Sequence, residues 1–142
     1  MKVLADSNIF IDFWNVRLDE KKHKAFSQIF STHDVIVCGV VRAEILHGAY
    51  SEKNRKGIHD ALALFENLSL DITDWEVLGD ELYEYRTHGV TVPFSDAIIA
   101  AIALKYDIDI WTRDKHFLKM QSVINRLKII DTDKLLEMTV DV

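Results

Sequence analysis

The sequence contains one cysteine and one proline among its 142 residues. Because Cys38 stands alone, no disulfide can form within the chain, and its place in the apolar run VIVC predicts a buried thiol in a reducing compartment. No apolar run approaches the roughly 18 residues needed to span a bilayer. The N-terminus lacks a basic segment followed by an apolar stretch and a small-residue cleavage site. We therefore expect a cytoplasmic protein with no membrane association.

The motifs of several common enzyme classes are also missing. There is no Gly-rich phosphate loop, no G-x-S-x-G nucleophile elbow, and no zinc-finger or H-E-x-x-H spacing among the six histidines. Glu44 and His47 form one E-x-x-H pair, but di-iron bundles need two such pairs and two further glutamates. Aspartyl-phosphate phosphatases carry a D-x-D motif after their first strand. In this chain Asn8 stands where the second aspartate would be.

An excess of positive charge is missing as well. The chain has 17 basic and 23 acidic residues, a net charge of −6. This balance argues against a nucleic-acid partner, because phosphate binding favours a basic surface. Local basic clusters carry more weight, and there are three: KKHK at 21–24, KNRK at 53–56, and Arg113 with Lys115 and Lys119. The objection weakens further if several of the acids share one metal-filled pocket.

Hydrophobic periodicity predicts strands that alternate with helices. The expected strands are 2–5, 35–39, 70–72, 107–114 and 128–130. The expected helices are 9–15, 18–30, 40–50, 58–68, 74–89, 96–107, 115–121 and 133–138. This order is typical of an α/β fold with a mainly parallel sheet covered on both faces. We expect one domain over residues 1–142, a three-layer α/β/α sandwich with a central sheet of four or five strands.

Two local features follow from the same pattern. The helices at 40–50 and 58–68 are joined by a polar, basic turn, SEKNRKG, and would form an αα-hairpin at about 40–68. The helix at 96–107 is apolar nearly all round and should be buried on several faces, with Ser95 as its N-cap.

Four acids are expected at the carboxyl edge of the sheet. Asp6 follows the first strand, Glu44 lies one turn into the helix after the second, Asp96 begins a helix, and Asp114 follows the strand IDIW. In open α/β sheets this edge forms the ligand-binding crevice. Crowded carboxylates repel unless a proton or a cation relieves them. All-oxygen ligands select hard ions such as Mg²⁺ or Mn²⁺, which activate water for phosphodiester hydrolysis.

Simpler roles for these acids stay open. Asp6 and Asp114 are also suited to cap helices, and Asp96 suits the dipole of a first helical turn. Glu44 is harder to explain this way, because its neighbours at helical spacing are apolar or small and an unpaired carboxylate among them would be costly. Four other acids are not assigned to the site: Asp12 is expected on the rim, Asp107 and Asp109 at the opposite edge of the sheet, and Asp131 after a last edge strand that holds it away from the crevice.

Three segments in order, ADSNIFID, VVRAEILHGA and SDAIIAAIALKYDIDIWTRDKHF, give the chain a specific resemblance that spans nearly its whole length. It resembles PIN-domain ribonucleases, particularly the VapC-type toxins of toxin–antitoxin pairs. The resemblance implies that Asp6, Glu44, Asp96 and Asp114 bind the metal. Ser7, Asn8 and Thr112 match polar positions that orient those acids or the water.

The resemblance further implies a PIN-like fold, Mg²⁺ or Mn²⁺ as cofactor, endonucleolytic cleavage of RNA, a homodimer, and inhibition by a cognate antitoxin in the active-site groove. One position departs from the family pattern. Many relatives carry another acid two residues after the fourth, where this chain has His116. That residue, with Arg113 and Lys115, is a candidate RNA contact, although the favoured interpretation of His116 is an exposed side chain.

Two rival functions are compatible with the same residues. The first is a PIN-like module that binds RNA or a protein without cutting, which the complete set of four acids disfavours. The second is the same chemistry acting in RNA processing or on DNA. The tryptophans Trp14, Trp75 and Trp111 are expected in the core rather than as platforms for base stacking.

Overall fold

The computed structural model describes residues 1–14 and 20–140. Its four strands form one parallel sheet in the order β2-β1-β3-β4. The strands are β1 (Lys2–Ala5), β2 (Asp34–Ile36), β3 (Asp109–Trp111) and β4 (Ile129–Ile130). The first strand is therefore central, flanked on both sides, and Val3 pairs in register with Val35 of β2 and Asp109 of β3.

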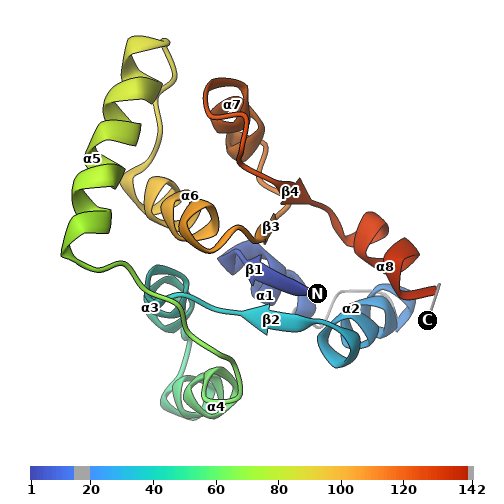
Figure 1. Cartoon of the computed structure of the whole chain (residues 1–142). Coiled ribbons are helices and arrows are strands. Elements are labelled where there is room, and N and C mark those ends of the chain that lie inside the picture. The colour runs from blue at the N-terminus through green and yellow to red at the C-terminus, as the bar shows by residue number, and fades with distance from the viewer. Residues whose placement is uncertain (15–19, 141–142) are drawn as a thin grey trace.

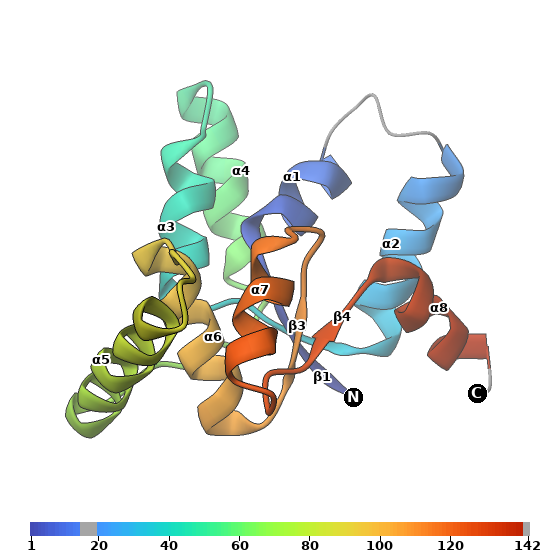
Figure 2. The same cartoon turned by 90° about the horizontal axis from the view of Figure 1, so that it is seen from above.

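Helices cover both faces of this sheet (Figure 1). Those described are α1 (Ser7–Trp14), α2 (Glu20–Thr32), α3 (Gly39–His47), α4 (Glu52–Leu62), α5 (Ile72–Thr87), α6 (Phe94–Tyr106), α7 (His116–Val123) and α8 (Thr132–Val140). Helices α3 to α6 lie on one side, and α2 and α8 on the other, as Figure 2 also shows. The predicted three-layer α/β fold is confirmed. The start of the helix predicted at 18–30 lies outside the described residues.

The core lies between these layers. Trp111 of β3 is fully buried, its ring packs against Phe26 and Phe30 of α2, and its indole N–H donates to Thr132 Oγ1 at 3.2 Å. On the other side α6 is apolar nearly all round and has six buried residues, as predicted. The single thiol of Cys38 is buried too. Among the described residues, no helix combines the length and apolar character that a bilayer crossing requires.

Three local predictions were wrong. The segment 51–57 is not a turn, because the Ser51 side chain accepts from the backbone N–H of Asn54 and starts α4 at Glu52. The strand expected at 70–72 does not form. Asp71 and Asp74 instead make a reciprocal capping box that starts α5 at Ile72. Ser95 lies inside α6 rather than capping it, since Pro93 occupies the N-cap position and no side chain caps the helix.

The α3–α4 hairpin is joined to the sheet through the side chain of Arg42. Its Nε donates to the carbonyl of Val37, Nη1 to that of Leu62 and Nη2 to that of Phe65, each at 2.8 Å. The three carbonyls belong to the residue that follows β2, the last residue of α4, and the loop after α4. One guanidinium thus fixes both ends of the hairpin that carries Glu44.

We predict that Arg42→Lys destabilises the fold by about 2–4 kcal/mol, because an ammonium cannot satisfy three divergent carbonyls and charged hydrogen bonds contribute about 1.5–3 kcal/mol each. Urea unfolding would measure this loss. Arg55→Lys is the matched control, since the ion pair of Arg55 within the described part of the chain is with the exposed Glu52 on the surface of α4. A similar loss in both variants would contradict the role assigned to Arg42.

Candidate functional site

A hollow at the carboxyl edge of the sheet brings together nine residues from separate parts of the chain. They are Asp6, Ser7, Asn8, Glu44, Asp96, Arg113, Asp114, Lys115 and His116. The loop after β1, helix α3, the first turn of α6 and the loop after β3 each contribute to this wall. All four predicted acids therefore line one hollow, as the alternating topology requires. Thr112 lies just behind it and is buried.

Asp6 is the most enclosed of the acids, with 4% of its surface exposed. Its backbone N–H donates to the carbonyl of Trp111 at 3.0 Å and so extends the pairing of β1 with β3. Its carboxylate accepts from the Ser7 N–H at 2.7 Å, from Asn8 Nδ2 at 3.1 Å and from the Thr112 hydroxyl at 2.8 Å. These donors fix the orientation of the carboxylate.

The Thr112 hydroxyl connects two strand ends. It donates to Asp6 and accepts from Asn8 Nδ2 at 3.2 Å and from the backbone N–H of Asp114 at 2.9 Å. A single hydroxyl thereby places Asp6 and the start of the Asp114 turn relative to each other. Ser7, Asn8 and Thr112 all contact the acids in the structure, and their roles in orienting them stay a prediction.

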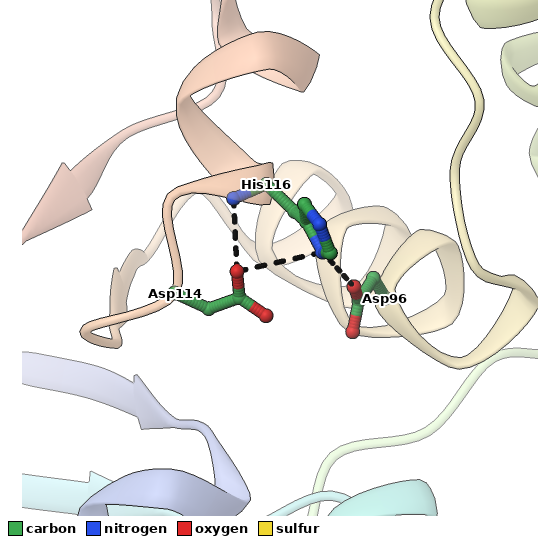
Figure 3. A group of neighbouring side chains, drawn as sticks. All are labelled: Asp96, Asp114 and His116. Carbon is green, nitrogen blue, oxygen red and sulfur yellow. Dashed lines mark hydrogen bonds and ion pairs between the residues drawn. The ribbon is translucent and has the colours of Figure 1, made fainter.

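Asp96, Asp114 and His116 form a tight group at one side of the hollow (Figure 3). Asp114 Oδ1 accepts from the His116 backbone N–H at 2.9 Å, and the ring Nδ1 of His116 lies 3.4 Å from the same oxygen and 3.7 Å from Asp96 Oδ2. One ligand atom from each residue lies within 4.8 Å of the others. Asp114 thus helps to start α7 and also faces the hollow, so the capping alternative is compatible with a role in the site.

The position of His116 is only partly what the sequence indicates. The side chain of His116 is 55% exposed, as the sequence predicts, but its ring nitrogen Nδ1 faces two carboxylates (Figure 3). The D-x-H spacing at a strand-to-helix turn is the signal for this arrangement, because a side chain that caps a first turn lies beside the residue two positions later.

Glu44 lies in the second turn of α3, and its side chain is exposed at the mouth of the hollow. The cost argument from its apolar neighbours was therefore wrong, because the carboxylate reaches water. Partial desolvation and the nearby charges of Asp6 and Asp96 still raise the pKa of Glu44.

Burial and the charges of neighbouring acids make the ionised form of several carboxylates in the hollow unfavourable. Burial raises the pKa of Asp96 to about 6, and Asp6 and Asp114 add to that effect while His116 opposes it. Burial also raises the pKa of Asp6, against the lowering effect of the hydrogen bonds from Thr112 and Ser7. The fold therefore holds these carboxylates together at an energetic cost that a cation would relieve.

Comparison with known proteins gives the family. The sequence profile of the PIN domain matches residues 3–123, most of the chain. The chain belongs to the PIN-domain family. It is 27% identical to ribonuclease VapC4 of Mycobacterium tuberculosis over 124 residues, which cover 86% of this chain and 93% of that protein.

Solved structures share the fold of this PIN domain. A crystal structure of VapBC2 from Rickettsia felis, bound to a DNA fragment from their promoter, matches with a TM-score of 0.75 at 16% identity, over 92% of this chain and 98% of that one. A crystal structure of VapBC-5, a member of the VapBC family of toxin–antitoxin systems from M. tuberculosis, matches with a TM-score of 0.64 at 21% identity. The match covers 92% of this chain and 98% of that one.

The two basic residues of the PIN domain that line the hollow differ in their contacts. Arg113 Nε and Nη2 donate to the two carboxylate oxygens of Asp12 on α1, at 2.5 and 3.1 Å, while Lys115 lines the hollow and is exposed. The sequence placed Asp12 only at the rim and missed this pair. The pair holds the Arg113 guanidinium in one orientation beside the acids.

The acids that the sequence placed away from the crevice have other contacts. Asp107 and Asp109 pair with Lys128 at the opposite end of β3, and Asp131 Oδ1 accepts from the backbone N–H of Lys134 at the start of α8. None of these three lines the hollow.

We predict that Asp96→Asn stabilises the metal-free protein at neutral pH. An acid with a raised pKa stays protonated in the folded state where the unfolded chain has lost its proton, so stability falls as pH rises from about 4 through 6. The amide removes that penalty, at most about 3 kcal/mol for a shift of about two pKa units. Urea unfolding in EDTA from pH 4 to 8 measures the slope. Asp80→Asn, on the exposed side of α5, is the control, and an unchanged slope in Asp96→Asn would contradict the prediction.

Proposed function

We propose that this PIN-domain protein is a VapC-type endoribonuclease that depends on Mg²⁺ or Mn²⁺. The observation that carries the proposal is the hollow in which Asp6, Glu44, Asp96 and Asp114 converge from four separate elements. Similarity to a ribonuclease over 86% of the chain supports the reaction class. A module that only binds RNA or protein has no use for carboxylates that repel one another.

The residues present fit a hard divalent cation. Four carboxylates supply oxygen ligands, and burial together with repulsion from neighbouring acids raises the pKa values of Asp6, Glu44 and Asp96, an effect that a bound cation would counter. The four acids would hold the ion, and the ring nitrogen of His116 lies close enough to Asp96 and Asp114 to take part. When bound, the ion would lower the pKa of a water molecule and neutralise charge on the phosphoryl group.

The remaining residues of the site orient the carboxylate of Asp6 or attract the phosphate of the substrate. Thr112 and Asn8 hold the carboxylate of Asp6 through two hydrogen bonds, so its oxygens cannot rotate away from the hollow. Lys115 and the oriented guanidinium of Arg113 present positive charge at the same hollow, where a backbone phosphate would approach. These cations offset the repulsion between the acids and an anionic substrate.

The proposal extends to partners. Similarity in fold to VapBC toxin–antitoxin complexes supports a cognate antitoxin protein as the inhibitor. The proposed working form is a cytoplasmic homodimer. RNA is the proposed substrate.

We predict that the pure protein cuts structured RNA with Mg²⁺ or Mn²⁺ and that EDTA stops it. Asp6→Asn should lose at least about 100-fold in rate, since even residues that only support metal ligands cost about 10–100-fold when changed. Gel analysis of a mixed RNA pool measures the rate, with Asp80→Asn as the control and DNA as a second substrate.

The outcomes of this assay separate the rival functions. Cutting that survives both EDTA and Asp6→Asn would rule out the site as drawn. RNA bound but never cut would favour a binding module, and preferred cutting of DNA would favour the second rival.

A further prediction has a readout other than activity. Mg²⁺ should raise the melting temperature of the wild-type protein by several degrees at saturating concentration, because an ion that binds only the folded state stabilises it. Asp96→Asn should gain clearly less, since it has one fewer charged ligand and less repulsion to relieve. Scanning calorimetry with KCl at equal ionic strength as the control measures both; equal gains would refute metal binding at Asp96.

A further inference from the structure

A second hollow lies between the end of α1 and one side of α4. Its lining includes Trp14, Tyr50, Lys53, Asn54 and Gly57. We propose that this hollow is a subsite that binds a base of single-stranded RNA, a few nucleotides from the cleavage point. The inference rests on the proposed ribonuclease function and adds to it a place where the substrate is gripped.

Two helices lead from the acids to this hollow. Helix α1 begins at Ser7, on the wall of the acidic hollow, and ends at Trp14, while α3 carries Glu44 and is followed by Tyr50. The two helices pack against each other, and they follow the carboxyl ends of the adjacent parallel strands β1 and β2. Seven helical residues span about 10 Å, the length of about three stacked nucleotides. One strand of RNA can therefore occupy both hollows.

The walls of the second hollow are aromatic and open to solvent. Tyr50 is 86% exposed and Trp14 is 36% exposed, with one part of the indole packed against Phe10 at a ring distance of 5.5 Å. The prediction that Trp14 belongs to the core was therefore wrong, and so was that for Trp75, which is 46% exposed; Trp111 is buried as expected. Exposed rings beside a hollow are stacking surfaces for any base.

The polar groups of the hollow match a nucleotide. Tyr50 N–H donates to Asn54 Oδ1 at 3.3 Å, which turns the amide so that its nitrogen keeps hydrogens for a base edge. Lys53 has no acidic partner among the described residues, whereas Arg55 on the same turn is paired with Glu52. A free ammonium, an amide and two rings combine phosphate attraction with stacking.

Charge decides between RNA and a protein as the occupant. The segment 51–57 carries three basic residues and one acid, in a chain whose net charge is −6. A hollow for an apolar helix or loop of a partner protein needs no such local excess. An RNA strand that approaches four carboxylates does need it, because each phosphate next to the acids must be attracted elsewhere.

The test is RNA affinity, measured by fluorescence anisotropy in EDTA at fixed salt with a labelled pool of short single-stranded RNAs. Tyr50→Ala should weaken binding about tenfold, the effect of losing one stacked base. Tyr50→Phe should bind as the wild type, because it keeps the ring. Tyr83→Ala, an exposed tyrosine on α5, should also leave affinity unchanged. Tyr50 is exposed enough that its loss should not unfold the protein.

An abasic oligonucleotide of the same length makes the test sharper. It keeps the phosphates, so Tyr50→Ala should not weaken its binding, whereas Lys53→Gln should weaken the binding of both ligands. Wild-type affinity of Tyr50→Ala for normal RNA would overturn the subsite, and so would an equal loss for abasic RNA.

A second copy or a partner protein as the occupant would leave the RNA affinity of Tyr50→Ala unchanged, and a second copy would also shift its sedimentation. If the wild type cuts RNA and Tyr50→Ala binds as well, only the subsite fails. If the wild type neither binds nor cuts RNA, the proposed function fails with it.

Discussion

The hydrogen bond from Thr112 to Asp6 is the contact on which the arrangement of the site depends. It joins the ends of the adjacent strands β1 and β3, and the same hydroxyl accepts from the backbone at Asp114. Two acids that are 108 positions apart in the sequence are thereby held in one frame. Without such a frame their repulsion would push them apart, because each gains free energy from more water and more distance.

The same arrangement of strands and hydrogen bonds explains why the four acids differ in their surroundings. Asp6 is buried and accepts several hydrogen bonds, so its orientation is fixed by the protein. Asp96 is shielded from water but faces other charges, and its pKa rises to about 6. Glu44 reaches the hollow from α3 and remains in solvent. Exposure therefore increases from the buried Asp6 to the exposed Glu44, which suits the ion and the phosphate of the proposed function.

The sequence predicts those parts of the structure whose signals are local and strong. The apolar runs before Asp6 and Asp114 predict their strands, and parallel strands then bring the two acids to one edge. The helical residues 52–57 were predicted as a turn because the segment is polar, and the cap by Ser51 outweighs that composition. The strand predicted at 70–72 does not form because the cap by Asp71 outweighs the β propensity of that segment. The contact of His116 with Asp96, and that of Arg113 with Asp12, depend on how α1, α6 and α7 meet, which no local pattern specifies.

The net charge of the chain is a poor guide to its partner because the charges are segregated. Acids gather at the carboxyl edge of the sheet, while Lys115 lies beside them and Lys53 lies along α4 beyond them. Arg42 ties the two regions together, since it anchors the hairpin that carries both Glu44 and Lys53. Under the proposed function, an anionic strand that occupies both hollows would meet a cation in each of them. The distribution of charge over the surface, and not its total, decides which ligands an acidic protein attracts.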